Sequence, residues 1–138
     1  MYLIDTNVIS EARKAGRADA GVRAFWRQAK ADQVYVAVQT LGEIQSGVES
    51  IRRRGDEAQA ALLERWLEAV SSQYAERVLA FDLDCARVWG GLMARGRQNP
   101  IDKQIAAVAL IHDLTVVTRN VRDFEGTGVR TLDPFGGA

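Results

Sequence analysis

The feature that most constrains the fold is the opening stretch, where a short apolar run stops at a carboxylate. Residues 2–4 (YLI) are followed by Asp5, Thr6 and Asn7, and apolar spacing then resumes. This order predicts a short buried strand that leads directly into a helix, with Thr6 or Asn7 capping the first free N–H groups. Ligands of an open parallel sheet bind at the carboxyl ends of its strands. Asp5 is therefore placed to be a metal ligand or phosphoryl-transfer residue, and the alternative is that it only caps the helix.

The rest of the chain alternates strand patterns with helix patterns, which predicts an α/β domain with a mainly parallel sheet. No internal repeat or linker interrupts residues 1–138, so we expect a single domain. The further strands are expected at residues 33–38, 78–81, 114–118 and 129–132. The further helices are expected at residues 22–29, 40–54, 56–74, 85–95 and 105–111, with a loose terminus at 133–137.

Two more acids lie at predicted helix starts. Thr40 and Glu43 match the S/T-x-x-E capping box, so Glu43 could reach back to Thr40 or point across the sheet edge toward Asp5. Asp102 lies two residues after Pro100, ahead of a nearly all-apolar helix, where the helix dipole favours a carboxylate. We expect Asp102 to face inward with the apolar side of that helix.

These acids have no histidine or cysteine partner in the pattern, and oxygen ligands alone suit Mg²⁺ or Mn²⁺ rather than zinc. The only histidine, His112, fits a surface position at a helix end, and the only cysteine, Cys85, fits a small core residue. Carboxylates held close together repel one another, which raises some of their pKa values unless a cation neutralises them. The cluster is therefore difficult to explain as structure alone.

Eighteen basic residues balance eighteen acidic ones, so the global charge carries no nucleic-acid signature and any such binding depends on local patches. The chain opens without a basic-then-apolar leader and has no run of about eighteen apolar residues, so we expect a cytoplasmic protein without a membrane anchor. Trp26, Trp66 and the helical hairpin over 40–74 offer more apolar surface than the sheet needs, which favours a homodimer.

Four segments together resemble the successive motifs of PIN-domain ribonucleases, specifically VapC-type toxins, and they span nearly the whole chain. The segments are LIDTNVIS at 3–10, LGEI at 41–44, PIDKQIAA at 100–107 and VTRNVRDF at 117–124. The resemblance implies a three-layer fold, with four to five strands and helices on both faces. It also implies that Asp5, Glu43 and Asp102 are the catalytic, metal-coordinating acids. Accessory roles are expected for Thr6, Asn7, Thr118, Asn120 and Asp123; where many PIN domains have a fourth acid, this chain has Asn120, with Asp123 as the nearest carboxylate.

The activity that the resemblance implies is hydrolysis of RNA by a Mg²⁺- or Mn²⁺-dependent endoribonuclease, with a loop of tRNA or ribosomal RNA as substrate. The implied partner is a VapB-like antitoxin, a small DNA-binding protein whose tail covers the active site. A zero-charge nuclease needs local cations to hold RNA beside its acids. The candidates flanking the motifs are Arg97, Lys103, Arg119 and Arg122.

Two other classes of protein remain as alternatives at this point. A haloacid-dehalogenase-like phosphatase also begins with a strand that ends in Asp, but it needs D-x-D, and Asn7 occupies the second position here. A non-catalytic regulatory α/β module would need only the fold. The number of acids at strand ends argues against such a module, and a metal titration would separate the two.

Overall fold

The computed structural model describes residues 1–136, which form a five-stranded sheet in the order β3-β2-β1-β4-β5. Every neighbouring pair of strands is parallel, as the alternating pattern predicted. In the central pairs Leu3 lies opposite Tyr35 of β2 and Val116 of β4. The strands are β1 (Tyr2–Ile4), β2 (Val34–Ala37), β3 (Val78–Leu79), β4 (Thr115–Val117) and β5 (Thr131–Leu132). β1 spans its whole apolar run, whereas the other four are shorter than the predicted strands, because flanking residues of each run leave the ladder for turns and helix starts.

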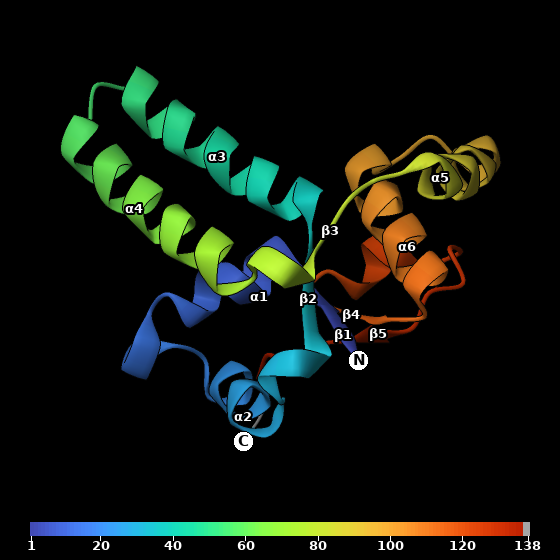
Figure 1. The fold of residues 1–138 in the computed structure, drawn as a ribbon, viewed down its shortest axis with the longest axis horizontal. Helices are drawn as coiled ribbons and strands as arrows, with labels where there is room; N and C mark the ends of the chain where they lie inside the picture. Colours follow the sequence, from blue (N-terminus) through green and yellow to red (C-terminus); the bar gives the residue numbers. More distant parts are fainter. Residues whose placement is uncertain (137–138) are drawn as a thin grey trace.

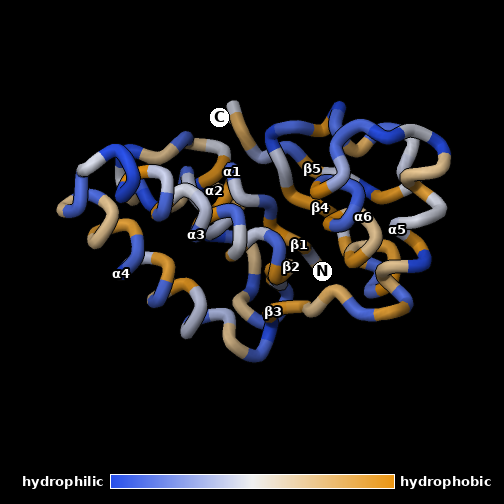
Figure 2. The backbone as a smooth tube through the Cα atoms, turned by 90° about the horizontal axis from the view of Figure 1, so that it is seen from above, coloured by the Kyte–Doolittle hydropathy of each residue, from blue (hydrophilic) through white to orange (hydrophobic). Residues whose placement is uncertain are grey.

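Helices cover both faces of the sheet, which confirms the three-layer arrangement (Figure 1). On one face lie α1 (Thr6–Ala12), α2 (Ala20–Gln28), α3 (Val38–Arg53) and α4 (Glu57–Gln73), and on the other lie α5 (Leu83–Arg95) and α6 (Pro100–His112). Successive side chains of a strand point to opposite faces of the sheet, so Leu3 packs with α5 and α6 whereas Ile4 packs with the other helices. Figure 2 shows the apolar strands between the two helical layers.

Two predicted helix N-caps are wrong, and both errors concern the site. The N-cap of α1 is Asp5, whose carboxylate accepts from the Thr6 N–H, rather than Thr6 or Asn7. The helix α3 begins at Val38 directly after β2, with Ala37 as an N-cap that supplies no side-chain bond. Thr40 is therefore buried inside the first turn, and no capping box with Glu43 forms.

The helical hairpin of α3 and α4 is confirmed, with Gly55 in the left-handed conformation that favours glycine (φ 90°) at the turn. The guanidinium of Arg52 joins the two helices, since it pairs with Glu49, Glu57 and Glu64 at 3.0–3.1 Å. Leu62 of α4 is 53% exposed. Arg52 is thus a structural residue rather than a free nucleic-acid contact.

The predicted start of α5 is close to the observed one, because Asp82 caps that helix as expected. Pro100 is the first residue of α6, which places Asp102 in its first turn. Cys85 is fully buried, as expected, and His112 is exposed at the end of α6.

The segment after β5 is docked rather than loose, which corrects the expectation for 133–136; Gly137 lies outside the described residues. The Gly136 N–H donates to the Asp19 carboxylate at 3.1 Å, and the ring of Phe135 lies 4.6 Å from the Arg119 guanidinium. Within residues 1–136, no helix has both the length and the apolar character needed to cross a membrane.

Candidate active site

Asp5 lies at the carboxyl end of the central strand and is 5% exposed. Its backbone N–H continues the ladder by donating to the Val117 carbonyl at 2.9 Å, so the sheet fixes its position. Its Oδ1 accepts from the Thr6 N–H at 2.8 Å, and its Oδ2 accepts from the Thr118 hydroxyl at 2.8 Å. Asp5 does cap α1, but capping uses only its Oδ1. Its Oδ2 is held by Thr118, the residue that follows β4.

Asn7 and Thr118 join the ends of β1 and β4. The Asn7 amide donates weakly to both Asp5 Oδ2 and the Thr118 hydroxyl, each at 3.4 Å, while its Oδ1 accepts from the Arg119 N–H at 3.0 Å. The Thr118 hydroxyl also accepts from the Asn120 N–H at 3.0 Å. Both residues therefore orient the Asp5 carboxylate and the loop after β4, and the Asn120 backbone is part of this network.

Glu43 belongs to the same site, but through Thr6. Its carboxylate accepts from the Thr6 hydroxyl at 2.7 Å, across 37 residues of sequence. A start of α3 at Val38 puts Glu43 in the second turn, where its side chain reaches the amino end of α1. Of its two predicted roles, the structure supports the one directed toward Asp5.

Burial and mutual repulsion raise the pKa values of these acids. For Asp5, loss of hydration raises the pKa above 3.8; hydrogen bonds from Thr118, Thr6 and Asn7 lower it, and Asp123 raises it further. For Glu43, lost hydration also raises the pKa most, against the bond from Thr6 and with repulsion from Asp5. Because much of the Glu43 side chain remains exposed, solvent weakens its share of the effect.

The carboxylate of Asp102 is repelled by each of the other three acids. Burial raises its pKa to about 6, and repulsion from Asp5, Asp123 and Glu43 contributes in that order. No lysine or arginine within residues 1–136 forms an ion pair with any of the four. The structure thus brings the predicted acids, including Asp123, into one electrostatic neighbourhood, and none of them has an ion-pair partner within residues 1–136.

This donor set fits a hard divalent cation, since it consists of carboxylate, hydroxyl and amide oxygens. Across the described residues, no three acids lie close enough to enclose a metal ion by themselves. Magnesium requires less, because it commonly binds one or two carboxylates and keeps several waters. The repulsion that raises the pKa of Asp102 is also the repulsion that a bound cation would relieve.

The four predicted RNA-binding cations have different surroundings. Lys103 is engaged, because its Nζ donates to the Gly96 carbonyl. Arg119 lies over the Phe135 ring, and together with Arg122 and Asp123 it lines a shallow hollow of about 340 Å³. Arg97 and Arg122 are exposed. The hollow beside Asp123 thus combines two arginines with one of the acids.

One pair at the site was missed by the sequence reasoning. The side-chain amide of Gln39 in α3 donates to the side-chain Oε1 of Gln104 in α6 at 3.3 Å, next to the turns that carry Glu43 and Asp102. The available signal was spacing, because Gln39 precedes Glu43 by one helical turn and Gln104 follows Asp102 by two residues. The pair joins the two helices that hold these acids.

Known proteins resemble this chain over its whole length. The family model described as PIN domain matches residues 2–128. The VapC ribonuclease Y4jK of Sinorhizobium fredii is 33% identical over 98% of this chain and 98% of its own length. Plasmid stability protein StbB of Pseudomonas syringae pv. tomato is 32% identical over 98% of this chain and 99% of its own. The crystal structure of FitAcB from Neisseria gonorrhoeae superposes with a TM-score of 0.85 at 28% identity, covering 97% of this chain and 98% of that one.

Proposed function

This chain belongs to the PIN-domain family, and we propose that it is a metal-dependent endoribonuclease that acts as the VapC-type toxin of a toxin-antitoxin pair. The observation that carries the proposal is the acid neighbourhood at the carboxyl end of the sheet, where burial and three other carboxylates raise the pKa of Asp102 to about 6. A structural role does not explain why this repulsion is left without a basic partner. Binding and hydrolysis of a phosphodiester beside a divalent cation would explain it.

In this proposal Asp5, Glu43 and Asp102 would hold Mg²⁺ or Mn²⁺, directly or through waters of the ion, with Asp123 close by. When bound, such a cation polarises the phosphate and supplies an attacking water of lowered pKa. The chain's own contribution is orientation: Thr118 and Thr6 fix the two oxygens of Asp5, and Thr6 also holds Glu43. Asn7 keeps the loop after β4 in place through the Arg119 N–H. Arg119 and Arg122, beside Asp123, are placed to bind the RNA backbone.

The antitoxin is proposed as the partner that controls this site. The VapC name of the Y4jK relative and the FitAcB likeness support a VapB-like protein, and StbB's description as a plasmid stability protein fits such a pair. An arginine from its tail would supply the ion-pair partner that the four acids do not have among residues 1–136. The proposed setting is the cytoplasm, and the proposed substrate is a loop of tRNA or ribosomal RNA. We also treat the chain as one domain, because both helical layers pack on the same sheet.

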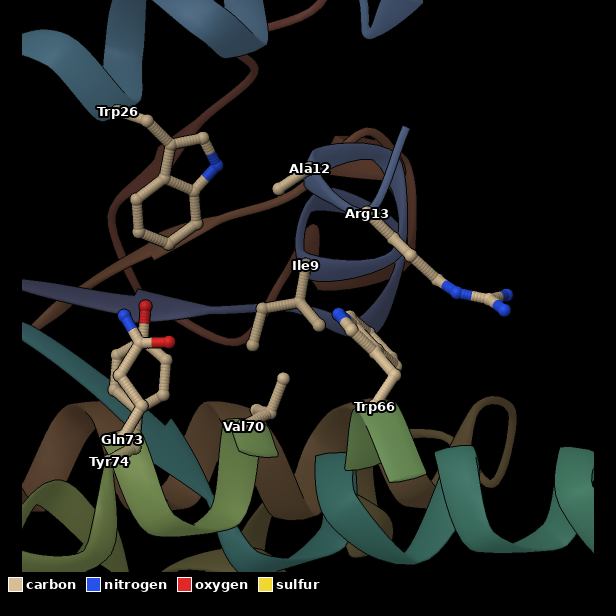
Figure 3. Close-up of a pocket in the computed structure, with 8 residues that line it drawn as sticks. All are labelled: Ile9, Ala12, Arg13, Trp26, Trp66, Val70, Gln73 and Tyr74. Atoms are coloured by element: carbon tan, nitrogen blue, oxygen red, sulfur yellow. The ribbon is translucent and has the colours of Figure 1, made fainter. Parts of the chain in front are cut away.

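The homodimer stays a prediction, and the structure changes the surface on which it rests. Trp26 and Trp66 do not form one flat outer face; they line opposite sides of a hollow of about 210 Å³ between α1, α2 and α4 (Figure 3). The indole N–H of Trp26 is buried without a hydrogen-bond partner, and Arg13 lies 5.6 Å from the centre of the Trp66 ring. A second copy or an antitoxin that used these two tryptophans would insert a side chain here.

The test of the proposed function is RNA cleavage by Asp5→Asn and Asp102→Asn. Each change keeps the side-chain volume but removes a charge, so we expect loss of Mg²⁺-dependent cleavage with the circular dichroism spectrum unchanged. Asp32→Asn is the matched control, since Asp32 is exposed and distant in sequence from every motif. Near-normal cleavage by either site variant would refute the assignment.

Membership of the PIN-domain family argues against the haloacid-dehalogenase alternative. Asn7, which takes the place of the second acid of D-x-D, acts in our proposal as a positioning residue. The non-catalytic alternative is separated by Mn²⁺ titration of the wild type and Asp5→Asn, followed by paramagnetic resonance. If the site is catalytic, we expect the wild type to bind Mn²⁺ and Asp5→Asn to lose that binding. Equal binding by both proteins, or by neither, would count against a metal site at Asp5.

A further inference from the structure

A third hollow, of about 480 Å³, lies at the end of α5, and no sequence motif predicted it. We call it the Trp89 hollow; it is lined by Trp89, Gly90, Met93, Arg95 and Arg97 with the small residues between them. Its volume lies within the roughly 300–1,000 Å³ range of sites that hold small ligands. The Trp89 indole is held in place, since its ring packs edge-on against Phe81 with centroids 6.4 Å apart.

The Trp89 hollow is tied to the acid site through the start of α6. The Trp89 indole N–H donates to the Pro100 carbonyl at 3.0 Å, and Pro100 opens the helix turn that contains Asp102. The Lys103 ammonium, next to Asp102, donates to the Gly96 carbonyl in the loop that borders the hollow. The hollow is therefore fixed relative to the first turn of α6, which carries Asp102.

The charge of the Trp89 hollow is opposite to that of the acid site. Arg97 is exposed, and Arg95 uses its guanidinium to donate to the Gly126 carbonyl at 3.2 Å. Neither arginine forms an ion pair with a carboxylate of residues 1–136. An aromatic ring with cations that have no carboxylate partner is the usual composition of a site for single-stranded nucleic acid, where bases stack on the ring and phosphates contact the cations.

We propose that the Trp89 hollow binds one unpaired nucleotide of the RNA substrate next to the scissile phosphate, with its base against Trp89 and its phosphate at Arg95 and Arg97. This inference rests on the ribonuclease function proposed above and adds a reason for substrate choice. A nucleotide inside a duplex has both base faces stacked, so it cannot lie on the indole. Trp89 is in this view a specificity residue and takes no part in the bond-breaking step.

Two adjacent glycines provide a matched test. Gly90 lines the hollow and Gly91 does not, both lie in α5, and a Cβ at either would meet no atom within 4 Å. We therefore expect the Gly90→Leu side chain to start from an open position and enter the hollow, and Gly91→Leu is its control. Each is combined with Asp5→Asn to prevent cleavage, and binding of a labelled ten-nucleotide single-stranded RNA is measured by fluorescence anisotropy.

We expect Gly90→Leu to weaken binding of the single strand roughly tenfold, equal to about 1.4 kcal/mol, while Gly91→Leu binds as the parent does. Trp89→Phe keeps an aromatic ring and should lose less affinity than Gly90→Leu. The same oligonucleotide in a duplex should bind all the variants equally.

Equal affinities of the two leucine variants for the single strand would overturn the proposal. It would also be overturned if Gly90→Leu weakened binding of a protein partner but not of RNA. Failure of the proposed function is a separate result, because it appears as absent RNA cleavage by the wild-type protein with Mg²⁺. If Gly90→Leu cleaves RNA with the kcat/KM of the wild type, the proposed role of the Trp89 hollow is rejected and the proposed ribonuclease function is not.

Discussion

Neutralising Asp102 is expected to stabilise the metal-free protein while removing its activity. The folded-state pKa of Asp102 is about 6, against an ordinary value of 3.8, because burial and three other carboxylates disfavour its charge. Between about pH 4 and pH 6 the folded protein thus binds more protons than the unfolded chain. The free energy of unfolding consequently falls as pH rises through this window, and the full cost is present above pH 6.

The magnitude follows from the difference between about 6 and 3.8. At about 1.4 kcal/mol for each tenfold change in proton affinity, the charge of Asp102 costs at most roughly 3 kcal/mol. Asp102 is only partly buried, so solvent screening lowers the expected gain in Asp102→Asn to about 1–2 kcal/mol. For a chain of this length that corresponds to a rise in Tm of roughly 4–8 °C.

Thermal unfolding in EDTA at pH 7.5 and at pH 5 measures this effect in the wild type, Asp102→Asn and the control Asp32→Asn. The advantage of Asp102→Asn should be present at pH 7.5 and shrink at pH 5, where the wild-type carboxyl is increasingly protonated. Added Mg²⁺ should stabilise the wild type more than Asp102→Asn. A variant less stable than the wild type at pH 7.5 in EDTA would show that the carboxylate is compensated, and the reasoning would fail.

Three further measurements address the rest of the site and its partners. Thr118→Val removes the hydroxyl that donates to Asp5 with little change in volume, so the pKa of Asp5 should rise and the acidic limb of the pH–rate profile should move to higher pH; an unmoved limb would contradict the role of Thr118. Neutralising Arg97 and Arg119 together should weaken RNA binding and reduce the slope of log affinity against log salt by about one for each lost phosphate contact, with Mn²⁺ binding intact, whereas an unchanged slope would place the RNA elsewhere. Trp66→Ala should shift sedimentation toward the monomer if the hollow between α1, α2 and α4 holds a second copy, and a wild type that sediments as a monomer at micromolar concentration without its antitoxin would contradict the homodimer.

The roles of residues that depend only on their neighbours in the chain could be predicted from the sequence. An apolar run that ends in Asp5 identifies both a buried strand and the polar end of it, since burial and capping depend on neighbours in the chain. Alternation of strand and helix patterns then implies a parallel sheet, and parallel strands bring their carboxyl ends to one edge. Asp5 and Asp102, and their closeness to Asp123, could be anticipated on these grounds and from the family motifs.

Contacts between distant segments could not be assigned in this way, because a one-residue difference at a helix start turns a side chain by about 100°. The capping box of Thr40 and Glu43 satisfied the local pattern, yet packing starts α3 at Val38, buries Thr40 and turns Glu43 to Thr6. The different surroundings of Lys103 and Arg97 likewise depend on where the Gly96 loop lies. Local chemistry thus determined which residues belong to the site, whereas the packing of α3, α5 and α6 on the sheet decided which partner each one has.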